Sequence, residues 1–212
     1  MGCWLIAFAE VPKIVDHEER RADLARAAVK VIDREGIEGA TLREIAKEAG
    51  YSTGIIGHYF GSRHDVLVAA LGYCMANATG RMAAVGDEHR GLKSIHEMAA
   101  ELLPLDRARS RENRIWLLYG AEALIAKRLR KEYQTHDGRL RALLRGAFEQ
   151  AIEDGELDGS IDAELEANRL LALNDGISLQ ALFDRDYWTD LRQLDAMDVH
   201  LDDLRRRGRP GS

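Results

Sequence analysis

The 212-residue chain contains few cysteines, prolines and aromatic side chains. Its two cysteines, Cys3 and Cys74, lie far apart in the sequence and have no metal-binding spacing, which argues against a disulfide framework or a zinc site. We therefore expect a reducing, cytoplasmic setting. Only three prolines interrupt the chain, β-branched runs are scarce, and Ala, Leu, Arg and Glu dominate. This composition predicts an all-α protein.

Long hydrophobic runs are also missing. The apolar stretch at residues 3–9 is too short to span a membrane and has no basic flank of the kind that precedes a signal sequence. We expect residues 1–15 to form a disordered extension and residues 208–212 a solvated tail. Low-complexity linkers and internal repeats are absent as well, so the folded parts of the chain are expected to be joined by helix.

Motifs of common enzymes are absent from the sequence. There is no P-loop, no glycine-rich dinucleotide loop after a strand, no HExxH and no nucleophile elbow. The seven histidines are scattered, and no two are spaced to share one helix face as metal ligands. We therefore predict no catalytic residue, no metal and no cofactor, and a protein that is not an enzyme.

The strongest pattern lies at residues 41–67. Thr41 stands three residues before Glu44, which forms a capping box at the start of a helix. Gly50 follows the last apolar position of that helix, and Ser52 can cap the next one. A glycine then ends the second helix, and a third begins after it. Two short helices across a tight turn form a helix-turn-helix, whose second helix fits the major groove of DNA.

The net charge of −6 at first argues against DNA binding, but its distribution matters more than its total. Residues 17–64 hold eight basic and eight acidic residues and are neutral, so the negative charge lies elsewhere. Affinity for DNA would then depend on a few placed contacts and would still fall with salt.

Helical periodicity continues after the motif. The pattern predicts helices near residues 16–36, 62–80, 92–103, 129–155, 163–183 and 188–206. Residues 115–126 read IWLLYGAEALIA, and a helix that is apolar on almost every side is expected at the centre of a bundle. We predict a three-helix helix-turn-helix domain at residues 16–62 and a helical ligand-binding and dimerisation bundle at residues 63–207.

The order of these elements resembles the TetR family of bacterial transcriptional regulators, most strongly over residues 20–68. Within that family the segment STGIIGHYF is similar to the choline-responsive BetI branch. The resemblance implies a homodimeric repressor that binds a palindromic operator and is released by a small effector. The matching residues are Gly36, Thr41, Ile45, Ala46, Ala49, Gly50, Ser52, Ile56, Tyr59, Phe60, Ser62, Arg63 and Leu67.

The candidate DNA contacts fall on the motif and on the helix that follows it. The resemblance implies that Thr41, Tyr59 and Arg63 contact phosphate, although Thr41 can be a cap only and Tyr59 can be packed in the core. Arg43 is either a DNA contact or a solvated side chain. The polar and small face of the second helix supplies the other candidates, which are Ser52, Thr53, Gly54, Ile55, Gly57 and His58.

The two glycines of that face bear on function. Each costs about 1 kcal/mol of helix stability relative to alanine, so a short helix gains nothing in stability from keeping them. Small residues instead allow the helix backbone to approach the groove, and the Thr53 methyl suits a thymine methyl. His58 is expected to donate to phosphate, with base reading as the alternative.

The candidate effector site consists of polar residues within apolar helices, because buried polar groups need partners. Trp, Tyr and a carboxylate together suit a quaternary ammonium ligand. The alternative is a packed core in which Glu122 and Asp175 form internal hydrogen bonds or lie at the dimer interface. The candidates are Trp116, Tyr119, Glu122, Phe148, Asn168, Asn174, Asp175 and Ser178.

The last two helices are expected to pair with their symmetry mates in the homodimer, although core packing is an equally open role for each candidate. These candidates are Leu171, Ile177, Leu182, Leu191 and Leu194. The rival hypothesis for the whole chain is a helical small-molecule-binding protein or enzyme whose helix-turn-helix is only structural. Within regulation, activation is the alternative to repression.

Overall fold

The computed structural model describes residues 17–207, and within that range the secondary structure is helical. The expected extension at residues 1–15 and the tail at 208–212 lie outside the described residues. The helices are α1 (His17–Gly39), α2 (Leu42–Ala49), α3 (Thr53–Tyr59), α4 (Arg63–Glu88), α5 (Gly91–Leu102), α6 (Arg107–Ile125), α7 (Lys127–Glu153), α8 (Ala163–Phe183) and α9 (Asp190–Arg207).

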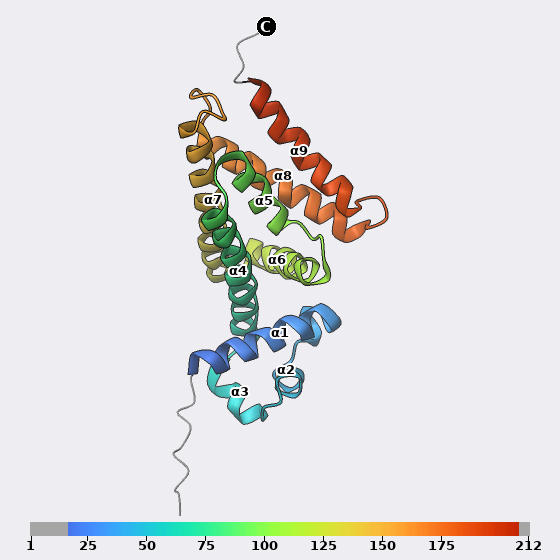
Figure 1. Cartoon of the computed structure of the whole chain (residues 1–212). Coiled ribbons are helices and arrows are strands. Elements are labelled where there is room, and N and C mark those ends of the chain that lie inside the picture. Colours follow the sequence, from blue (N-terminus) through green and yellow to red (C-terminus); the bar gives the residue numbers. More distant parts are fainter. Residues whose placement is uncertain (1–16, 208–212) are drawn as a thin grey trace, which may run out of the picture.

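The helices form two ends joined by α4. In Figure 1, α1, α2 and α3 cluster at one end, and α4 leads away from them into the bundle formed by α5 to α9. Because α4 is a single uninterrupted helix, the chain crosses between the ends without a flexible tether, as the sequence predicted. The division at residue 62 stays a prediction, since α1 packs against both α4 and α6.

The helix boundaries around the motif follow the predicted caps. The side chain of Thr41 accepts a hydrogen bond from the Glu44 amide, and Ser52 does the same for the amide of Ile55. Gly50 adopts a left-handed conformation, with φ of 72°, which ends α2 and turns the chain toward α3. The first helix breaks at Gly36, where φ is 74°, and one further helical turn follows.

Ion pairs connect the two ends beside α4. Asp33 of α1 lies 2.9 Å from Arg111 and 2.7 Å from Arg114, both on the first half of α6. At the start of α4, Asp65 accepts from the Ser62 hydroxyl and pairs with Arg128 of α7 at 2.9 Å. These pairs connect α6 and α7 to the end that carries the motif.

The expectation for residues 115–126 was wrong. Within α6 only Ile115, Tyr119 and Ala123 are buried, whereas Leu124 and Ile125 are 74% and 84% exposed. The helix covers one side of the bundle instead of running through its middle, so one stripe of its side chains packs inward. Trp116, Leu117 and Leu124 line a cavity, and Ile125 lies at the surface, a distinction that composition alone does not make.

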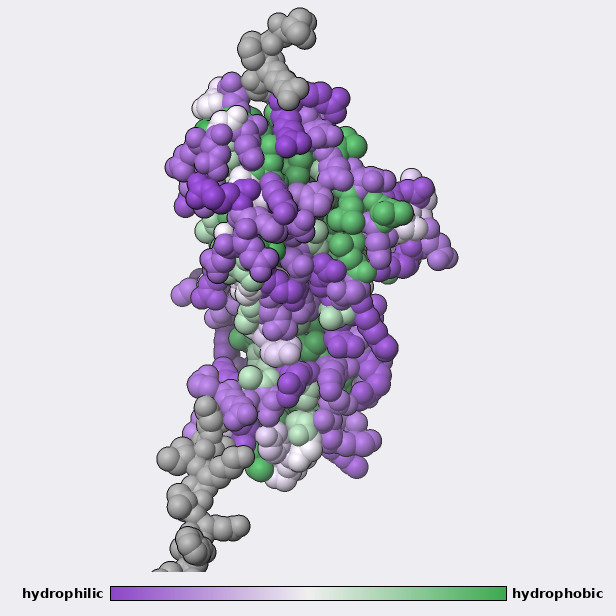
Figure 2. All heavy atoms as spheres, viewed as in Figure 1, coloured by the Kyte–Doolittle hydropathy of each residue, from purple (hydrophilic) through white to green (hydrophobic). Residues whose placement is uncertain are grey.

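An apolar surface lies on α8 and α9, where Figure 2 shows hydrophobic side chains gathered around the ends of these helices that meet. We call it the α8–α9 face, and its exposed apolar members near these ends and in the loop between them are Leu179, Phe183, Tyr187 and Leu191. Of the predicted dimer contacts, Leu191 belongs to this face and Leu194 is half-buried. Leu171 and Ile177 are buried inside the protomer, so for these two the core alternative holds.

Across residues 17–207, no helix combines the length and hydropathy that a membrane span requires.

Candidate DNA-binding surface and effector pocket

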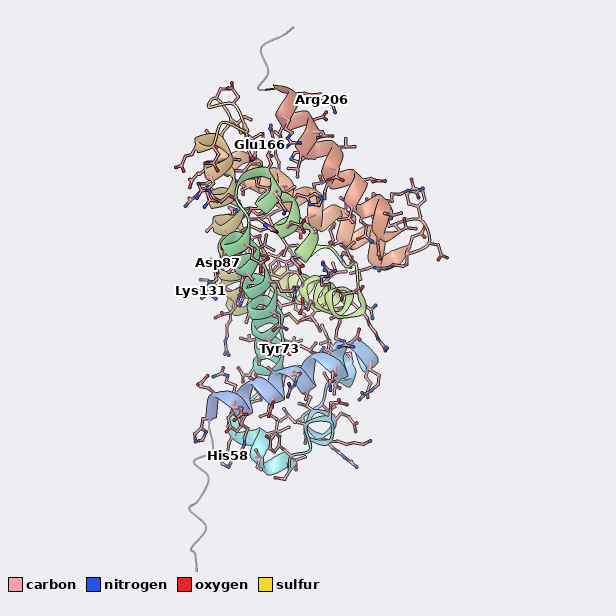
Figure 3. The ribbon with its side chains drawn as sticks, viewed as in Figure 1. His58, Tyr73, Asp87, Lys131, Glu166 and Arg206 are labelled. Atoms are coloured by element: carbon pink, nitrogen blue, oxygen red, sulfur yellow. The ribbon has the colours of Figure 1, made fainter. Side chains whose placement is uncertain are left out.

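Helix α3 presents its small and polar residues outward at the end of the molecule. Ser52, Thr53, Gly54, Gly57 and His58 are all exposed, and Figure 3 places His58 at this outer end. A surface of this kind has few protruding side chains, so the backbone of a helix can approach a groove closely. The predicted candidates on α3 therefore lie together on one accessible surface.

The opposite side of α3 anchors it. Ile56 and Phe60 are 0% and 1% exposed and belong to the core formed with α1, α2 and α4. Ile55, by contrast, is only half-buried, and so is Tyr59. These two core side chains fix which face of α3 is free to meet DNA.

The space around Gly54 and Gly57 could hold a larger side chain in the free protomer. A Cβ atom added at Gly57 would meet nothing within 4 Å, and one added at Gly54 would meet only the Ser52 hydroxyl at 3.9 Å. Both residues lie within α3, so neither packing nor backbone conformation requires glycine at these positions. The stability cost of two glycines is thus not offset within the protomer.

The hydroxyl of Tyr59 is held by a residue that sequence reasoning missed. His17 Nδ1 lies 3.0 Å from the Tyr59 hydroxyl oxygen, and the two rings are tilted, with their centroids 6.1 Å apart. His17 comes from the start of α1, which is distant in the sequence, so periodicity gives no signal for this contact. The pair presents a hydroxyl and an imidazole side by side next to α3.

Arg63 meets an acidic neighbour in the free protein. Its guanidinium donates to Glu38 at 2.7 Å, and Glu38 is largely exposed. Thr41 and Arg43 are exposed at the start of α2. A phosphate that binds Arg63 must therefore compete with a carboxylate that is already paired with it.

A pocket lies between α6, α7 and α8 at the other end of the molecule. Its outer chamber has a volume of about 580 Å³, and the apolar part of its lining comprises Leu117, Gly120, Ala121, Ala123, Leu124, Leu179 and Leu182. A smaller inner chamber of about 40 Å³ extends toward α4 and α5. Asn113, Trp116 and Asp175 line both chambers and mark the place where they meet.

Asp175 is the central polar group of this pocket. Burial among protein atoms and the nearby Asp137 raise the pKa of its carboxyl group to about 6, against which a hydrogen bond from Trp116 acts. The residue is nevertheless exposed to solvent, which reaches it through the pocket. Trp116 in turn stacks on Tyr133, with ring centroids 4.0 Å apart.

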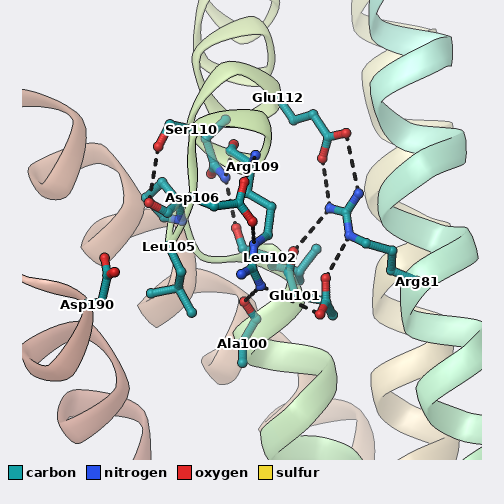
Figure 4. Close-up of polar contacts among 12 residues, drawn as sticks. Arg81, Ala100, Glu101, Leu102, Leu105, Asp106, Arg109, Ser110, Glu112 and Asp190 are labelled. Carbon is teal, nitrogen blue, oxygen red and sulfur yellow. Dashed lines mark hydrogen bonds and ion pairs between the residues drawn. The ribbon is translucent and has the colours of Figure 1, made fainter.

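Among the charged side chains that line the inner chamber, an arginine forms ion pairs with two glutamates. Arg81 of α4 lies 2.7 Å from Glu101 and 2.7 Å from Glu112, and Figure 4 shows the guanidinium between these carboxylates. Asp106 caps α6 beside them by accepting from the amide and side chain of Arg109. This network ties α4, α5 and α6 together at the floor of the pocket.

The structure brings half of the predicted effector residues to the pocket. Trp116, Asn174, Asp175 and Ser178 line one chamber or both. The other four candidates, which are Tyr119, Glu122, Phe148 and Asn168, are not among the residues that line it. Tyr119 and Phe148 are instead buried in the core, and Glu122 and Asn168 are half-buried.

Tyr133 and Asp137, both on α7, are among the pocket residues that escaped prediction. Tyr133 fits the apolar stripe of that helix and reads as core, and Asp137 follows one turn later. Burial raises the pKa of the Tyr133 hydroxyl, and Asp175 and Asp137 add to that effect. The signal that sequence offered was the spacing of four residues between them, which places both on one side of a helix.

Two family models match the chain. Residues 24–70 match the family of bacterial regulatory proteins of the TetR type, and residues 93–206 match the C-terminal domain of BetI-type transcriptional repressors. The chain belongs to the TetR family. The fold and the motif that were described above are those of this family, with a BetI-type C-terminal domain.

Related proteins support the same assignment over most of the chain. The regulator PksA of Bacillus subtilis is 33% identical over 175 residues, which is 82% of this chain and 84% of the relative. The regulator BetI of Vibrio parahaemolyticus is 29% identical over 175 residues, covering 80% and 84%. This TetR-family chain is thus a DNA-binding transcriptional regulator, and repression, homodimers and effector release are typical of its family.

Solved structures share the fold. A transcriptional regulator from Rhodococcus sp. Rha1 has a TM-score of 0.77 and 26% identity, covering 91% of this chain and 99% of that one. A regulator from Saccharomonospora viridis, solved in complex with choline, has a TM-score of 0.74 and 25% identity, covering 88% and 95%. These relatives are regulators, so they favour a DNA-binding role over a helix-turn-helix that is merely structural.

Proposed function

We propose that this TetR-family chain is a repressor that binds a palindromic operator as a homodimer and leaves it when a small molecule fills the pocket between α6, α7 and α8. The observation that carries this proposal is the free face of α3, where small and polar residues lie opposite a buried anchor. No catalytic role is assigned to any residue, and we place its action in the cytoplasm.

On DNA, α3 enters the major groove with Gly54 and Gly57 facing the bases. Thr53 and Ile55 contact base edges, because a methyl group recognises thymine. Ser52 and His58 flank this surface. The remaining contacts fix the position of the protein on phosphate and carry no sequence information; they come from Thr41, Arg43, Tyr59 and Arg63.

The dimer forms through the α8–α9 face. A protomer that exposes Phe183 at 79% and Leu191 at 74% leaves apolar surface in water, and a two-fold partner covers the same surface on both copies. Half-buried Leu182 and Leu194 extend this contact at its edge. Two recognition helices then meet successive major grooves, which lie about 34–36 Å apart.

Release follows from the position of α6. Trp116 lines the pocket, and Arg114 lies two residues before it and pairs with Asp33 of the DNA-binding end. A ligand that shifts α6 therefore displaces α1, which packs on α2 and α4. Effector binding favours a spacing of the two α3 helices that no longer fits successive grooves.

A gel-shift experiment with the DNA upstream of this protein's own gene tests the proposal. The protein is expected to retard the DNA as a dimer, and Tyr59→Phe combined with Arg63→Ala is expected to weaken binding without unfolding. Lys93→Ala removes an exposed positive charge at the other end and is the matched control. Failure to retard the DNA at low salt, with a folded protein by circular dichroism, would favour a purely small-molecule-binding helical protein.

A further inference from the structure

The pocket holds one carboxylate that has no cationic partner among the lining residues. Four carboxylates line its two chambers, and three of them are paired. Glu101 and Glu112 pair with Arg81, and Asp137 pairs with Arg141. Asp175 forms no ion pair within residues 17–207, and the neighbour that favours its ionised form is Trp116. An ionised carboxylate in such surroundings is stabilised by a cation, and the protein supplies none.

The cationic side chains of the pocket are themselves engaged. Arg130, which lines the outer chamber, donates to the carbonyl oxygens of Ala123 and Leu124 and so caps the end of α6. Arg81 lies between its two glutamates. An anionic ligand would therefore meet Asp175 and no free guanidinium, which argues for the opposite charge on the ligand.

Aromatic rings stand next to Asp175 in a fixed arrangement. Trp116 stacks on Tyr133 at an interplanar angle of 22°. Gly120 makes room for this stack, because a Cβ atom at that position would lie 3.3 Å from the Tyr133 ring. Aromatic rings beside a carboxylate attract an organic cation through both the charge and the ring quadrupole.

The outer chamber determines what else the ligand carries. Its volume of about 580 Å³ exceeds that of the inner chamber, about 40 Å³, by a wide margin, and its wall is formed mainly by Leu, Ala and Gly. A small cation placed at Asp175 leaves this apolar space filled with water. An apolar chain or ring attached to the cation would release that water.

We infer that the effector is an amphipathic organic cation, with a compact ammonium group at Asp175 and Trp116 and an apolar body in the outer chamber toward Leu117 and Leu124. The inference rests on the proposed function, since it names the ligand class of the same pocket. It also separates this chain from its relative solved with choline, because choline has no apolar body to fill the outer chamber.

Calorimetric titration of the purified full-length protein without DNA tests the inference. The probes are tetramethylammonium, choline, butyltrimethylammonium and octyltrimethylammonium, with octanoate and octan-1-ol as chain-matched anionic and neutral compounds. Affinity is expected to rise roughly fourfold for each methylene that is buried, and the octyl cation to bind at least about tenfold more tightly than octanoate or octanol.

Variants separate the two parts of the site. Asp175→Asn is expected to weaken the octyl cation at least about tenfold and to leave octanol unchanged, whereas Asp186→Asn, an exposed aspartate outside the pocket, is the matched control. Leu117→Gln is expected to reduce the gain with chain length but not the binding of tetramethylammonium. Thermal unfolding curves verify that each variant is folded.

Several outcomes would overturn the inference. They are equal binding of octanol and the octyl cation, tighter binding of octanoate, affinity that does not change with chain length, and an Asp175→Asn variant that binds like the parent. Because these titrations contain no DNA, any of them leaves the gel shift described above intact. A negative gel shift with positive titrations would instead refute only the role as a regulator released from DNA.

Discussion

The DNA-binding end and the pocket differ in whether the key charged side chain already has an ion-pair partner. At the DNA-binding end Arg63 is already paired with Glu38, and Glu48 lies between Lys30 and Arg34. In the pocket, by contrast, Asp175 has aromatic neighbours and no cation. Binding of DNA thus replaces existing ion pairs with phosphate contacts, whereas binding of an effector supplies a charge that is missing.

Packing differs between the ends as well. The side of α3 that faces the protein is completely buried at Ile56, and its outer side is small and open. Helix α6 has a buried stripe too, yet several of its other residues border a cavity. A solid core on one side and empty space on the other suit a rigid reading surface and an adaptable ligand site, respectively.

The largest expected effect is the unfolding of the DNA-binding end while the ligand-binding end stays folded. Phe60→Ala removes a side chain that is 1% exposed from the core between α3 and α4, and we expect a loss of about 3–5 kcal/mol in stability. Operator binding should be abolished, while ligand binding monitored by Trp116 fluorescence should persist. Denaturant unfolding followed by circular dichroism measures the first effect. Loss of ligand binding at the same time would show that the ends do not fold separately.

The next effect concerns the pH dependence of the pocket. The pKa of Asp175 is raised from 3.8 to about 6, so the carboxylate that holds a cation is lost as the pH falls through 6. We expect the affinity for an ammonium ligand to fall about tenfold for each pH unit below that value. Calorimetric titrations across this range measure it, and Asp175→Asn should remove the dependence.

The raised pKa of Asp175 changes the stability of the free protein in the opposite direction, because lower pH weakens ligand binding but favours the folded state. A carboxyl group with a raised pKa favours the folded state when protonated. Its contribution is therefore complete below 3.8 and is lost as the pH rises through about 6. Comparison of unfolding curves for the parent and Asp175→Asn at pH values on both sides of this window isolates the contribution, and parallel curves would contradict the assignment.

A smaller effect tests the glycines of α3. Gly57→Ala should stabilise the protein by about 1 kcal/mol, because alanine is the better helix former and its methyl group meets no atom within 4 Å. Operator affinity should nevertheless fall, since the methyl group would enter the space between the helix and the bases. Thermal unfolding and gel shift measure the two effects. A variant with raised stability and unchanged DNA affinity would show that Gly57 does not approach the groove.

The smallest expected effect comes from Glu38. Glu38→Gln frees Arg63 from an exposed ion pair, and such pairs contribute about 0.2–1 kcal/mol. Operator affinity should rise by a few-fold at low salt and by less at high salt, because the carboxylate also repels phosphate. Fluorescence anisotropy of labelled DNA at two salt concentrations measures the change. Weaker DNA binding by this variant would mean that Glu38 positions Arg63 productively.

Sequence reasoning succeeded where local chemistry determines structure. The caps at Thr41, Ser52 and Gly50 depend on residues three to five positions apart, so their pattern is visible in the chain. The contact between His17 and Tyr59 was not predictable, because it joins helices that are distant in the sequence. The same reason hid the pairing of Arg63 with Glu38.

For the helices of the bundle, the sequence alone does not distinguish the side that faces a cavity from the side that faces the core. Residues 115–126 are apolar for two reasons at once, since Ile115 packs inward while Leu117 borders the pocket. Leu171 and Ile177 likewise share the apolar character of Leu191 but are buried within the protomer. Only the arrangement of α6, α7 and α8 in space brings Trp116, Tyr133 and Asp175 together.

One measurement tests most directly the claim that the pocket at one end controls the DNA-binding surface at the other. Labelled operator DNA is bound by the parent protein or by Asp175→Asn, and octyltrimethylammonium is then titrated while anisotropy is recorded. The parent and the variant should bind the DNA equally, but the variant should need at least about tenfold more ligand for release. Release of both proteins at the same ligand concentration, or of neither, would contradict the account.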